Sequence, residues 1–262
     1  MTVTPSLQRR PGPTDGTMNN GPASLYGEPL VNSHCSEFEV NKWALSEFVV
    51  RRLLPVVGIH PFPLDELLLM SAAVCRLRPR HIFEWGTHVG KSARIFYETC
   101  RWLGLGATVH SIDLADHVSH VEHPGGQRGR LVQGLESVRL YQGDGLATAQ
   151  ALGRGLAHEA PFLFFLDGDH SEQVVARELR GVAGAFPEAA MLVHDTFYQS
   201  PESNYCTDPH AALEKFLAQS SGQYAAITAS TGLPGMALLF RKGAGPGLRT
   251  PPGGTSLQGM LK

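Results

Sequence analysis

The chain has 262 residues, and 22 lysines and arginines nearly balance 24 aspartates and glutamates, giving a formal net charge of −2. This length is enough for one large α/β domain with appendages. No block of basic residues marks a nucleic-acid or membrane surface, and no apolar run approaches the roughly 20 residues of a transmembrane helix. We therefore expect neither a nucleic acid nor a membrane as a partner.

Both ends of the chain have the composition of flexible tails. Residues 1–32 are rich in Pro, Gly, Asn, Ser and Thr, and residues 243–262 are rich in Gly and Pro. The first residues include two arginines but no apolar core of a signal peptide. The four cysteines are scattered without a C-x-x-C pair, which favours free thiols. These features predict a cytoplasmic protein with a single domain over residues 33–242.

Two helices are expected before the first strand. The first spans 36–54, with Ser36 as its N-cap and Pro55 as the residue that ends it. The second spans 64–77 and has two acids in its first turn, where the helix dipole favours them. Together they form an N-terminal helical cap over 33–78. The cap either packs on the sheet or forms part of a substrate or dimer wall, and a dimer wall would make the protein a homo-oligomer.

The most informative stretch, 81–96, reads HIFEWGTHVGKSARIF. An apolar strand runs into an acid, Glu84, and a loop with Gly86 and Gly90 follows. A helix is then expected from about Lys91. The order strand, glycine turn, helix is typical of nucleotide-binding α/β folds. Glycines let the backbone approach a ligand, and the helix N-terminus offers unpaired N–H groups.

Three ligand-binding patterns compete for this loop. A P-loop needs G-x-x-x-x-G-K-[ST], but only three residues separate the two glycines here. A dinucleotide fingerprint, G-x-G-x-x-G, fails because its middle glycine is His88. The third pattern, acid-x-Gly-x-x-x-Gly, resembles motif I of the class I S-adenosylmethionine (SAM) methyltransferases, in which the acid faces the amino-acid end of SAM. A glycine turn without a ligand is the remaining alternative.

The next two expected strands also end near aspartates. The segment 107–113 ends in Asp113, 23 residues beyond Gly90. An acid there can accept hydrogen bonds from both ribose hydroxyls of a nucleoside, although this spacing does not separate SAM from NAD. The segment 138–145 contains Asp144, which resembles the residue that borders adenine in class I methyltransferases. A turn aspartate is the alternative for that position.

Two later strands end in clusters of polar residues. Residues 162–166 are all apolar, as expected for a strand buried on both faces of a parallel sheet. The segment 189–197 contains the next strand. Ligands of such sheets bind beyond the carboxyl ends of the strands, so these polar groups are candidates for chemistry. They are Asp167, Asp169, His170, His194 and Asp195.

The order of elements predicts the fold class. Five strands alternate with helices, and two further strands, joined by residues 231–235, form an antiparallel hairpin at the sheet edge. Alternation of this kind indicates an α/β domain. We expect a Rossmann-like, doubly wound seven-stranded sheet, mostly parallel with a C-terminal antiparallel hairpin, plus N-terminal helices. The terminal hairpin is the feature that resembles class I methyltransferases.

A longer pattern narrows the resemblance. This pattern covers about 83–217. It consists of E-x-G-x-x-x-G-x-S, then D-G-D-H-S, then a second strand that ends in Asp. This arrangement is similar to the cephalosporin-hydroxylase-like and macrolide-sugar O-methyltransferases, which use SAM with a divalent cation. The resemblance implies that Asp167 and Asp195 are metal ligands and that His170 is the general base. It implies a SAM site made of Glu84, Gly86, Thr87, Gly90, Ser92, Asp113, Asp144 and Asp167.

The sequence departs from this family at position 194. The relatives have Glu-Asp where this chain has His194-Asp195. A neutral imidazole nitrogen can bind a metal, but Mg²⁺ prefers oxygen ligands. Either the site binds Mg²⁺ weakly, or it favours a cation such as Mn²⁺ with His194 as a third ligand, or it holds no metal. In the last case the aspartates are simply solvated strand ends.

The expected function follows from these parts. It is methylation by SAM of a hydroxyl on a sugar or small natural product, with nitrogen and carbon acceptors left open. A cation would align and acidify the acceptor, and a base would remove its proton. Two alternatives remain. One is a nucleotide-binding phosphotransferase or NTPase built on GTHVGKS, and the other is a SAM-binding module without catalysis.

Overall fold

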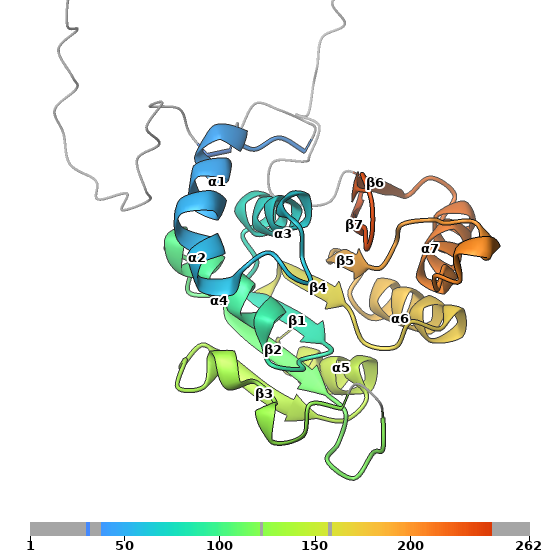
Figure 1. Cartoon of the computed structure of the whole chain (residues 1–262), viewed down its shortest axis with the longest axis horizontal. Coiled ribbons are helices and arrows are strands. Elements are labelled where there is room, and N and C mark those ends of the chain that lie inside the picture. Colours follow the sequence, from blue (N-terminus) through green and yellow to red (C-terminus); the bar gives the residue numbers. More distant parts are fainter. Residues whose placement is uncertain (1–29, 32–37, 121–122, 157–158, 243–262) are drawn as a thin grey trace, which may run out of the picture.

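Seven strands form one sheet in the order β3-β2-β1-β4-β5-β7-β6 (Figure 1). The computed structural model describes residues 30–31, 38–120, 123–156 and 159–242, so both predicted tails lie outside the described residues. The strands are β1 (His81–Trp85), β2 (Thr108–Asp113), β3 (Val138–Gln142), β4 (Phe162–Leu166), β5 (Ala190–His194), β6 (Tyr224–Ala229) and β7 (Met236–Arg241). The predicted α/β class and mixed seven-stranded sheet are confirmed.

Parallel pairing holds the first five strands together, and the hairpin closes one edge. β1 lies at the centre, with Ile82 opposite Val109 of β2 and Leu163 of β4. β7 pairs antiparallel with both β5 and β6, which leaves β6 at the edge. Because β1, β2, β4 and β5 run in the same direction, their carboxyl ends meet along one side of the sheet.

Helices cover both faces of the sheet (Figure 1). On one face lie α1 (Lys42–Phe48), the π-helical η1 (Val49–Leu53), α2 (Leu54–Val57), α3 (Leu64–Leu77) and α4 (Lys91–Trp102). On the other lie α5 (Gly145–Leu156), α6 (Glu172–Ala185) and α7 (Asp208–Gln219). β4 shows why both layers form, because Leu163 and Phe165 enter one core while Phe164 and Leu166 enter the other. A strand with an apolar residue at every position is stable only when other elements cover both faces of the sheet.

The first helix differs from its predicted bounds at both ends. It begins at Lys42, where the Asn41 side chain accepts a hydrogen bond (3.2 Å) from the Ala44 N–H. Pro55 does not end it. The turn before Pro55 is π-helical, and Pro55 occupies the first turn of α2, where a missing N–H costs little. The helical stretch ends at Gly58, which adopts a left-handed φ of 67°.

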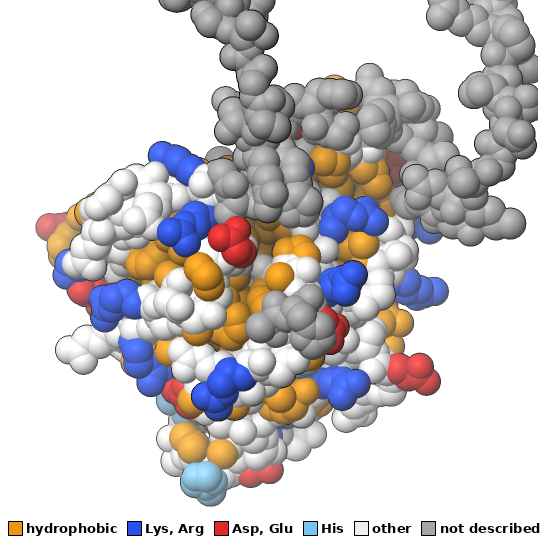
Figure 2. Space-filling model, turned by 180° about the vertical axis from the view of Figure 1, so that it is seen from behind, with side chains coloured by type: hydrophobic (Ala, Val, Ile, Leu, Met, Phe, Trp, Pro, Cys, Tyr) orange, Lys and Arg blue, Asp and Glu red, His pale blue; other side chains and the backbone are white. Residues whose placement is uncertain are grey.

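The surface charge and the helix lengths bear on the expected partners. Lysine and arginine side chains are scattered singly over the face seen in Figure 2 and do not gather into one patch. Within the described parts of the chain, no helix combines the length and the apolar character needed to cross a membrane. The cytoplasmic location and the homo-oligomer stay predictions.

Candidate active site

A cleft of about 1330 Å³ opens where the central strands end at their carboxyl side. Loops after β1, β2, β3, β4 and β5 all contribute to its lining, together with the segment before α3 and the turn between β6 and β7. This is the position at which open α/β sheets bind their ligands. Of the sequence-predicted site residues, Gly86, Asp113, Asp144, Asp167, His170, His194 and Asp195 line it.

Glu84 lies behind the cleft wall, not in it. Its side chain is fully buried, and its carboxylate accepts hydrogen bonds from the Ser92 hydroxyl (2.5 Å) and from the Ser111 hydroxyl. Thr87 completes this cluster through a 2.6 Å contact with Ser111. Burial raises the pKa of Glu84 to about 7, although both serine hydrogen bonds lower it. The predicted direct contact of Glu84 with the amino-acid end of SAM does not match this geometry, because the side chain is fully buried and does not line the cleft.

The two loop glycines are required by protein contacts. Gly86 has a φ of 94°, and a Cβ there would lie 1.9 Å from the Asp167 carbonyl oxygen. Gly90 has a φ of 85°, and its Cβ would approach Val132 to 3.0 Å. The glycine at 86 therefore lets the β1 and β4 loops touch at the cleft. Gly90, Thr87 and Ser92 support the loop from behind and do not line the cleft.

The same loop is not arranged as a phosphate cradle. The N–H groups of Gly86, His88 and Gly90 donate to the Ile112 carbonyl (3.0 Å), the Asp113 carboxylate (2.9 Å) and the Thr87 carbonyl (2.6 Å). The Lys91 ammonium donates to the His60 carbonyl. In a P-loop these N–H groups and the lysine bind the phosphates. Their engagement inside the protein disfavours the NTPase alternative.

Asp113 has the predicted position at the end of β2. One carboxylate oxygen accepts from the His88 N–H and lies 3.5 Å from Nε of Arg128, and the other accepts from the Leu114 N–H (2.8 Å). These contacts fix the carboxylate at the cleft wall. Each carboxylate oxygen offers about two lone-pair directions, so acceptor capacity remains for a ligand hydroxyl.

Asp144 is a turn aspartate that also lines the cleft. Its Oδ1 accepts from the Ala147 N–H (2.8 Å), which caps the start of α5 as a turn aspartate would. Its Oδ2 accepts from Arg177 (2.6 Å) of α6. Asp144 nevertheless lines the cleft beside Trp85, whose ring packs so closely that a Cβ on Gly145 would lie 2.5 Å from it.

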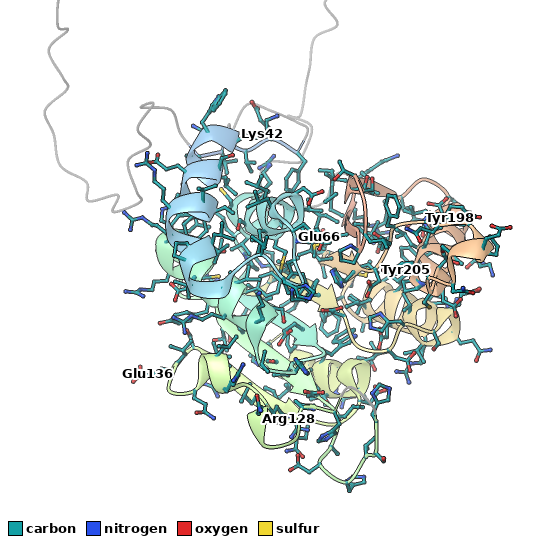
Figure 3. The ribbon with its side chains drawn as sticks, viewed as in Figure 1. Lys42, Glu66, Arg128, Glu136, Tyr198 and Tyr205 are labelled. Carbon is teal, nitrogen blue, oxygen red and sulfur yellow. The ribbon has the colours of Figure 1, made fainter. Side chains whose placement is uncertain are left out.

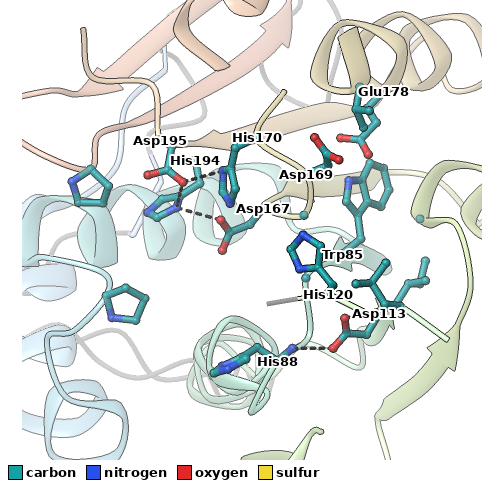
Figure 4. Close-up of a pocket in the computed structure, with 18 of the residues that line it drawn as sticks. Trp85, His88, Asp113, His120, Asp167, Asp169, His170, Glu178, His194 and Asp195 are labelled. Atoms are coloured by element: carbon teal, nitrogen blue, oxygen red, sulfur yellow. Dashed lines mark hydrogen bonds and ion pairs between the residues drawn. The ribbon is translucent and has the colours of Figure 1, made fainter. Parts of the chain in front are cut away.

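Asp167, His194 and Asp195 come together as predicted, because β4 and β5 are parallel neighbours. One potential ligand atom from each lies within 4.8 Å of the others. Nδ1 of His194 is 2.9 Å from Oδ1 of Asp167 and 3.4 Å from Oδ2 of Asp195 (Figure 4). Burial alone would lower the pKa of His194. The Asp167 charge and hydrogen bonds to Asp167, Asp195 and Glu66 outweigh it, so this pKa lies well above 6.5.

Asp195 links several side chains of the site. Its Oδ2 is 2.9 Å from Nδ1 of His170, and its Oδ1 accepts from the Tyr205 hydroxyl (2.7 Å). Its backbone has a left-handed φ of 55°, an uncommon conformation for a non-glycine residue and one that occurs at functional sites. His170 thus pairs with Asp195, while the carboxylate of its neighbour Asp169 accepts from the Ser171 N–H.

The cluster fits a divalent cation. Adjacent ligand atoms around an octahedral cation with bonds of about 2.1 Å are about 3.0 Å apart, and the two separations at Nδ1 of His194 are 2.9 and 3.4 Å. One imidazole with two carboxylates suits Mn²⁺ and later transition metals better than Mg²⁺. All three residues line the cleft, so a bound ion would face a ligand there.

An apolar wall lines the same cleft as this cluster. It consists of Ile59, Pro61 and Pro63 before α3, Leu64 at the start of α3, and Leu233 and Pro234 in the β6–β7 turn. Ile59, Leu64 and Leu233 are 58%, 45% and 43% exposed, which is unusual for large apolar side chains. Their gathering at one cleft wall indicates a surface that a ligand covers.

Several residues of the site escaped sequence reasoning. Glu66 of α3 contacts His194, and Tyr205 in the loop after β5 contacts Asp195 (both labelled in Figure 3). Arg128 supports Asp113 from the loop after β2. Glu66 had a sufficient explanation as a first-turn helix acid, and neither Tyr205 nor Arg128 belongs to any motif. No local signal could have found them.

No protein-family model and no curated protein matches the chain. Solved structures do resemble it. Cofactor-bound Rv0187 from MTB has 16% identity and a TM-score of 0.50, over 76% of this chain and 87% of that one. The O-methyltransferase from Bacillus cereus in complex with SAH has 16% identity, 76% and 90% coverage, and a TM-score of 0.49. The SAH-bound Podospora anserina methyltransferase PaMTH1 has 18% identity, 67% and 77% coverage, and a TM-score of 0.48.

At 16% identity, the likeness to cofactor-bound Rv0187 bears on the fold alone. The strand order of this chain is a separate observation on that fold. The sheet order β3-β2-β1-β4-β5-β7-β6 puts a single antiparallel strand, β7, between β5 and β6. Helices cover both faces, and the cleft lies at the carboxyl ends of the parallel strands. The chain therefore has the class I methyltransferase fold.

Proposed function

We propose that this protein is a SAM-dependent methyltransferase that methylates an oxygen of a small molecule with the help of a divalent cation. The observation that carries the proposal is the composition of one cleft. At one end Asp113 and Asp144 can recognise a nucleoside, and at the other the Asp167–His194–Asp195 cluster adjoins an apolar wall. Group transfer requires that the donor and the acceptor be held side by side, and the two ends of this cleft would hold them in that way.

SAM would bind along the loops after β1, β2 and β3. The Asp113 carboxylate would accept the ribose hydroxyls, and Asp144 would border the adenine. The Gly86 backbone would face the amino-acid end of SAM in place of Glu84, since Gly86 is the residue of this pair that lines the cleft. The Glu84 cluster would keep the loop in shape from behind.

Asp167, His194 and Asp195 would hold the cation. When bound, such an ion aligns an acceptor oxygen and lowers the pKa of its proton. The charge of the two carboxylates keeps a cation at this end of the cleft, and the imidazole favours Mn²⁺ over Mg²⁺.

His170 is the residue best situated to accept the proton of the acceptor hydroxyl. Its Nδ1, 2.9 Å from Asp195, can donate to that carboxylate, which makes Nε2 the basic nitrogen. Asp195 then orients the imidazole and stabilises its protonated form. Methyl transfer leaves SAH and the methylated oxygen, while the proton resides on His170.

The apolar wall supports an acceptor that carries its hydroxyl on an apolar body. Ile59, Leu64 and Leu233 would lose contact with water when such a body binds. A free sugar would instead leave most of its hydroxyls against hydrocarbon without hydrogen-bond partners. Among the predicted acceptors, a natural product with an apolar skeleton therefore fits this cleft better than an unmodified sugar.

A non-catalytic SAM-binding module is the remaining alternative. The His170–Asp195 pair beside the Asp167–His194–Asp195 cluster argues against it, because binding alone would not need these groups.

The test of the proposed function combines calorimetry with a methyl-transfer assay. We expect SAM and SAH to bind and ATP not to bind. With hydroxylated apolar acceptors and SAM labelled on its methyl group, we expect turnover that EDTA abolishes and Mn²⁺ restores better than Mg²⁺. Full turnover after exhaustive chelation would exclude the metal role, and absence of SAM binding would exclude the function.

A further inference from the structure

His194 is held from both sides of its ring. On the cleft side Nδ1 faces Asp167 and Asp195. On the buried side Nε2 is 3.1 Å from Oε2 of Glu66, which comes from α3, 128 residues earlier in the chain. Glu66 is 1% exposed, so this contact is shielded from water. The Phe62 ring packs against the imidazole in a T-shaped arrangement, with ring centroids 5.0 Å apart.

Glu66 is itself fixed in place. Its second oxygen, Oε1, accepts a 2.8 Å hydrogen bond from the Gly235 N–H in the turn between β6 and β7. A backbone N–H can only donate, so the Glu66 carboxylate cannot rotate away without leaving this buried donor unpaired. Its other oxygen therefore remains directed at Nε2 of His194.

This arrangement decides which nitrogen of His194 can bind a metal. A carboxylate can only accept, so Nε2 must carry a proton to satisfy Glu66. In the neutral imidazole, the lone pair is then on Nδ1, the nitrogen that faces Asp167 and Asp195. Metal-binding histidines commonly have their second nitrogen hydrogen-bonded in this way, and the partner orients the ring and increases its basicity.

We propose that Glu66 is a positioning residue that sets the tautomer and orientation of His194 and so makes Nδ1 the third ligand of the cation. The proposal rests on the metal site of the proposed function and adds to it a specific dependence on α3 and the β6–β7 turn. A carboxylate at position 194 would need no such partner, whereas an imidazole does, because it has two different nitrogens and only one faces the cleft.

The test replaces Glu66 by glutamine, which has the same shape but only one acceptor oxygen. Glutamine therefore cannot accept hydrogen bonds from both the Gly235 N–H and Nε2 of His194 through separate oxygens. In Glu66→Gln, one amide oxygen can serve the Gly235 N–H, which leaves the amide NH₂ facing Nε2 of His194. That contact favours the tautomer with the proton on Nδ1, which cannot bind a metal. We expect calorimetric Mn²⁺ affinity of the SAM-free protein to fall about 10- to 100-fold. Thermal unfolding and SAM affinity report whether the variant is folded.

Two comparisons separate positioning from a general effect of charge. Glu178→Gln removes another buried carboxyl at the cleft wall that does not contact His194, and we expect it to leave Mn²⁺ affinity near wild type. In a His194→Ala background there is no ring to orient. Adding Glu66→Gln should therefore leave the affinity where His194→Ala alone set it.

The outcomes are distinct. The positioning role would be overturned if the Glu66→Gln protein bound Mn²⁺ like the wild type. It would also be overturned if Glu66→Gln weakened Mn²⁺ binding by the same factor with and without His194. Wild-type protein that binds no Mn²⁺ would contradict the metal site of the proposed function, and this inference with it. Loss of affinity confined to proteins that retain His194 supports the proposal.

Discussion

Glu84→Gln tests whether the acid of the glycine-loop motif is a buried structural group. The side chain is fully buried, and its pKa rises from 4.5 to about 7 because burial disfavours the charged form. In the unfolded chain this carboxyl loses its proton near pH 4.5, while in the folded protein it keeps the proton to about pH 7. The stability from Glu84 is therefore fully present below pH 4.5 and is lost as pH rises through 7.

One pKa unit corresponds to 1.36 kcal/mol, so this rise amounts to about 3 kcal/mol between the two ends of the pH range. That is a large share of the 5–15 kcal/mol that typically stabilises a domain. Glutamine keeps the shape and can hydrogen-bond both Ser92 and Ser111, but it carries no titrating proton. We expect Glu84→Gln to match the wild type at pH 4.5 and to exceed its unfolding free energy by up to about 3 kcal/mol at pH 8.

Urea unfolding of both proteins from pH 4.5 to 8 provides the measurement, with Glu136→Gln on the exposed turn before β3 as the control. Comparing variant with wild type cancels the titration of every other group. If the difference between them stayed constant across this pH range, Glu84 would not be a buried, protonated carboxyl. The assignment of its role behind the cleft wall would then be wrong.

Three further predictions concern the cleft. Asp113→Asn should weaken SAM binding about 10- to 100-fold, because a hydrogen bond to a charged group contributes about 1.5–3 kcal/mol; unchanged affinity by calorimetry, with the exposed Glu136→Gln as control, would contradict the ribose assignment. His170→Gln should lower turnover about 10²- to 10⁴-fold while SAM affinity stays near wild type, and near-normal turnover would leave His170 only a structural role. Gly86→Ala should lower the unfolding free energy by about 1–3 kcal/mol or more, because its Cβ would lie 1.9 Å from the Asp167 carbonyl oxygen; a urea midpoint equal to wild type would show that the two loops separate at little cost.

The sequence predicted those features that local patterns encode. Five consecutive apolar residues at 162–166 require burial on both faces, and the structure covers both. The glycines at 86 and 90 predict a turn after the first strand, and the structure has this turn, with positive φ at both positions. Because polar residues follow neighbouring parallel strands, the sequence also predicted that Asp167 and Asp195 converge, and they do. Strand ends, glycine turns and periodicity depend on residues close together in the chain, so they can be read without coordinates.

Only the tertiary structure decided how each acid is used. Glu84 follows the motif of a ligand-facing acid, yet the packing of Ser92 and Ser111 around it makes it a buried structural group. Glu66 has the sequence context of a first-turn helix acid, and the structure buries it to 1% exposure against His194. Burial and partner choice arise from contacts between segments far apart in the chain, 128 residues in the case of Glu66 and His194. Periodicity shows that such a residue is on a helix, but the protonation, the partner and the role of its carboxylate depend on what the fold brings beside it.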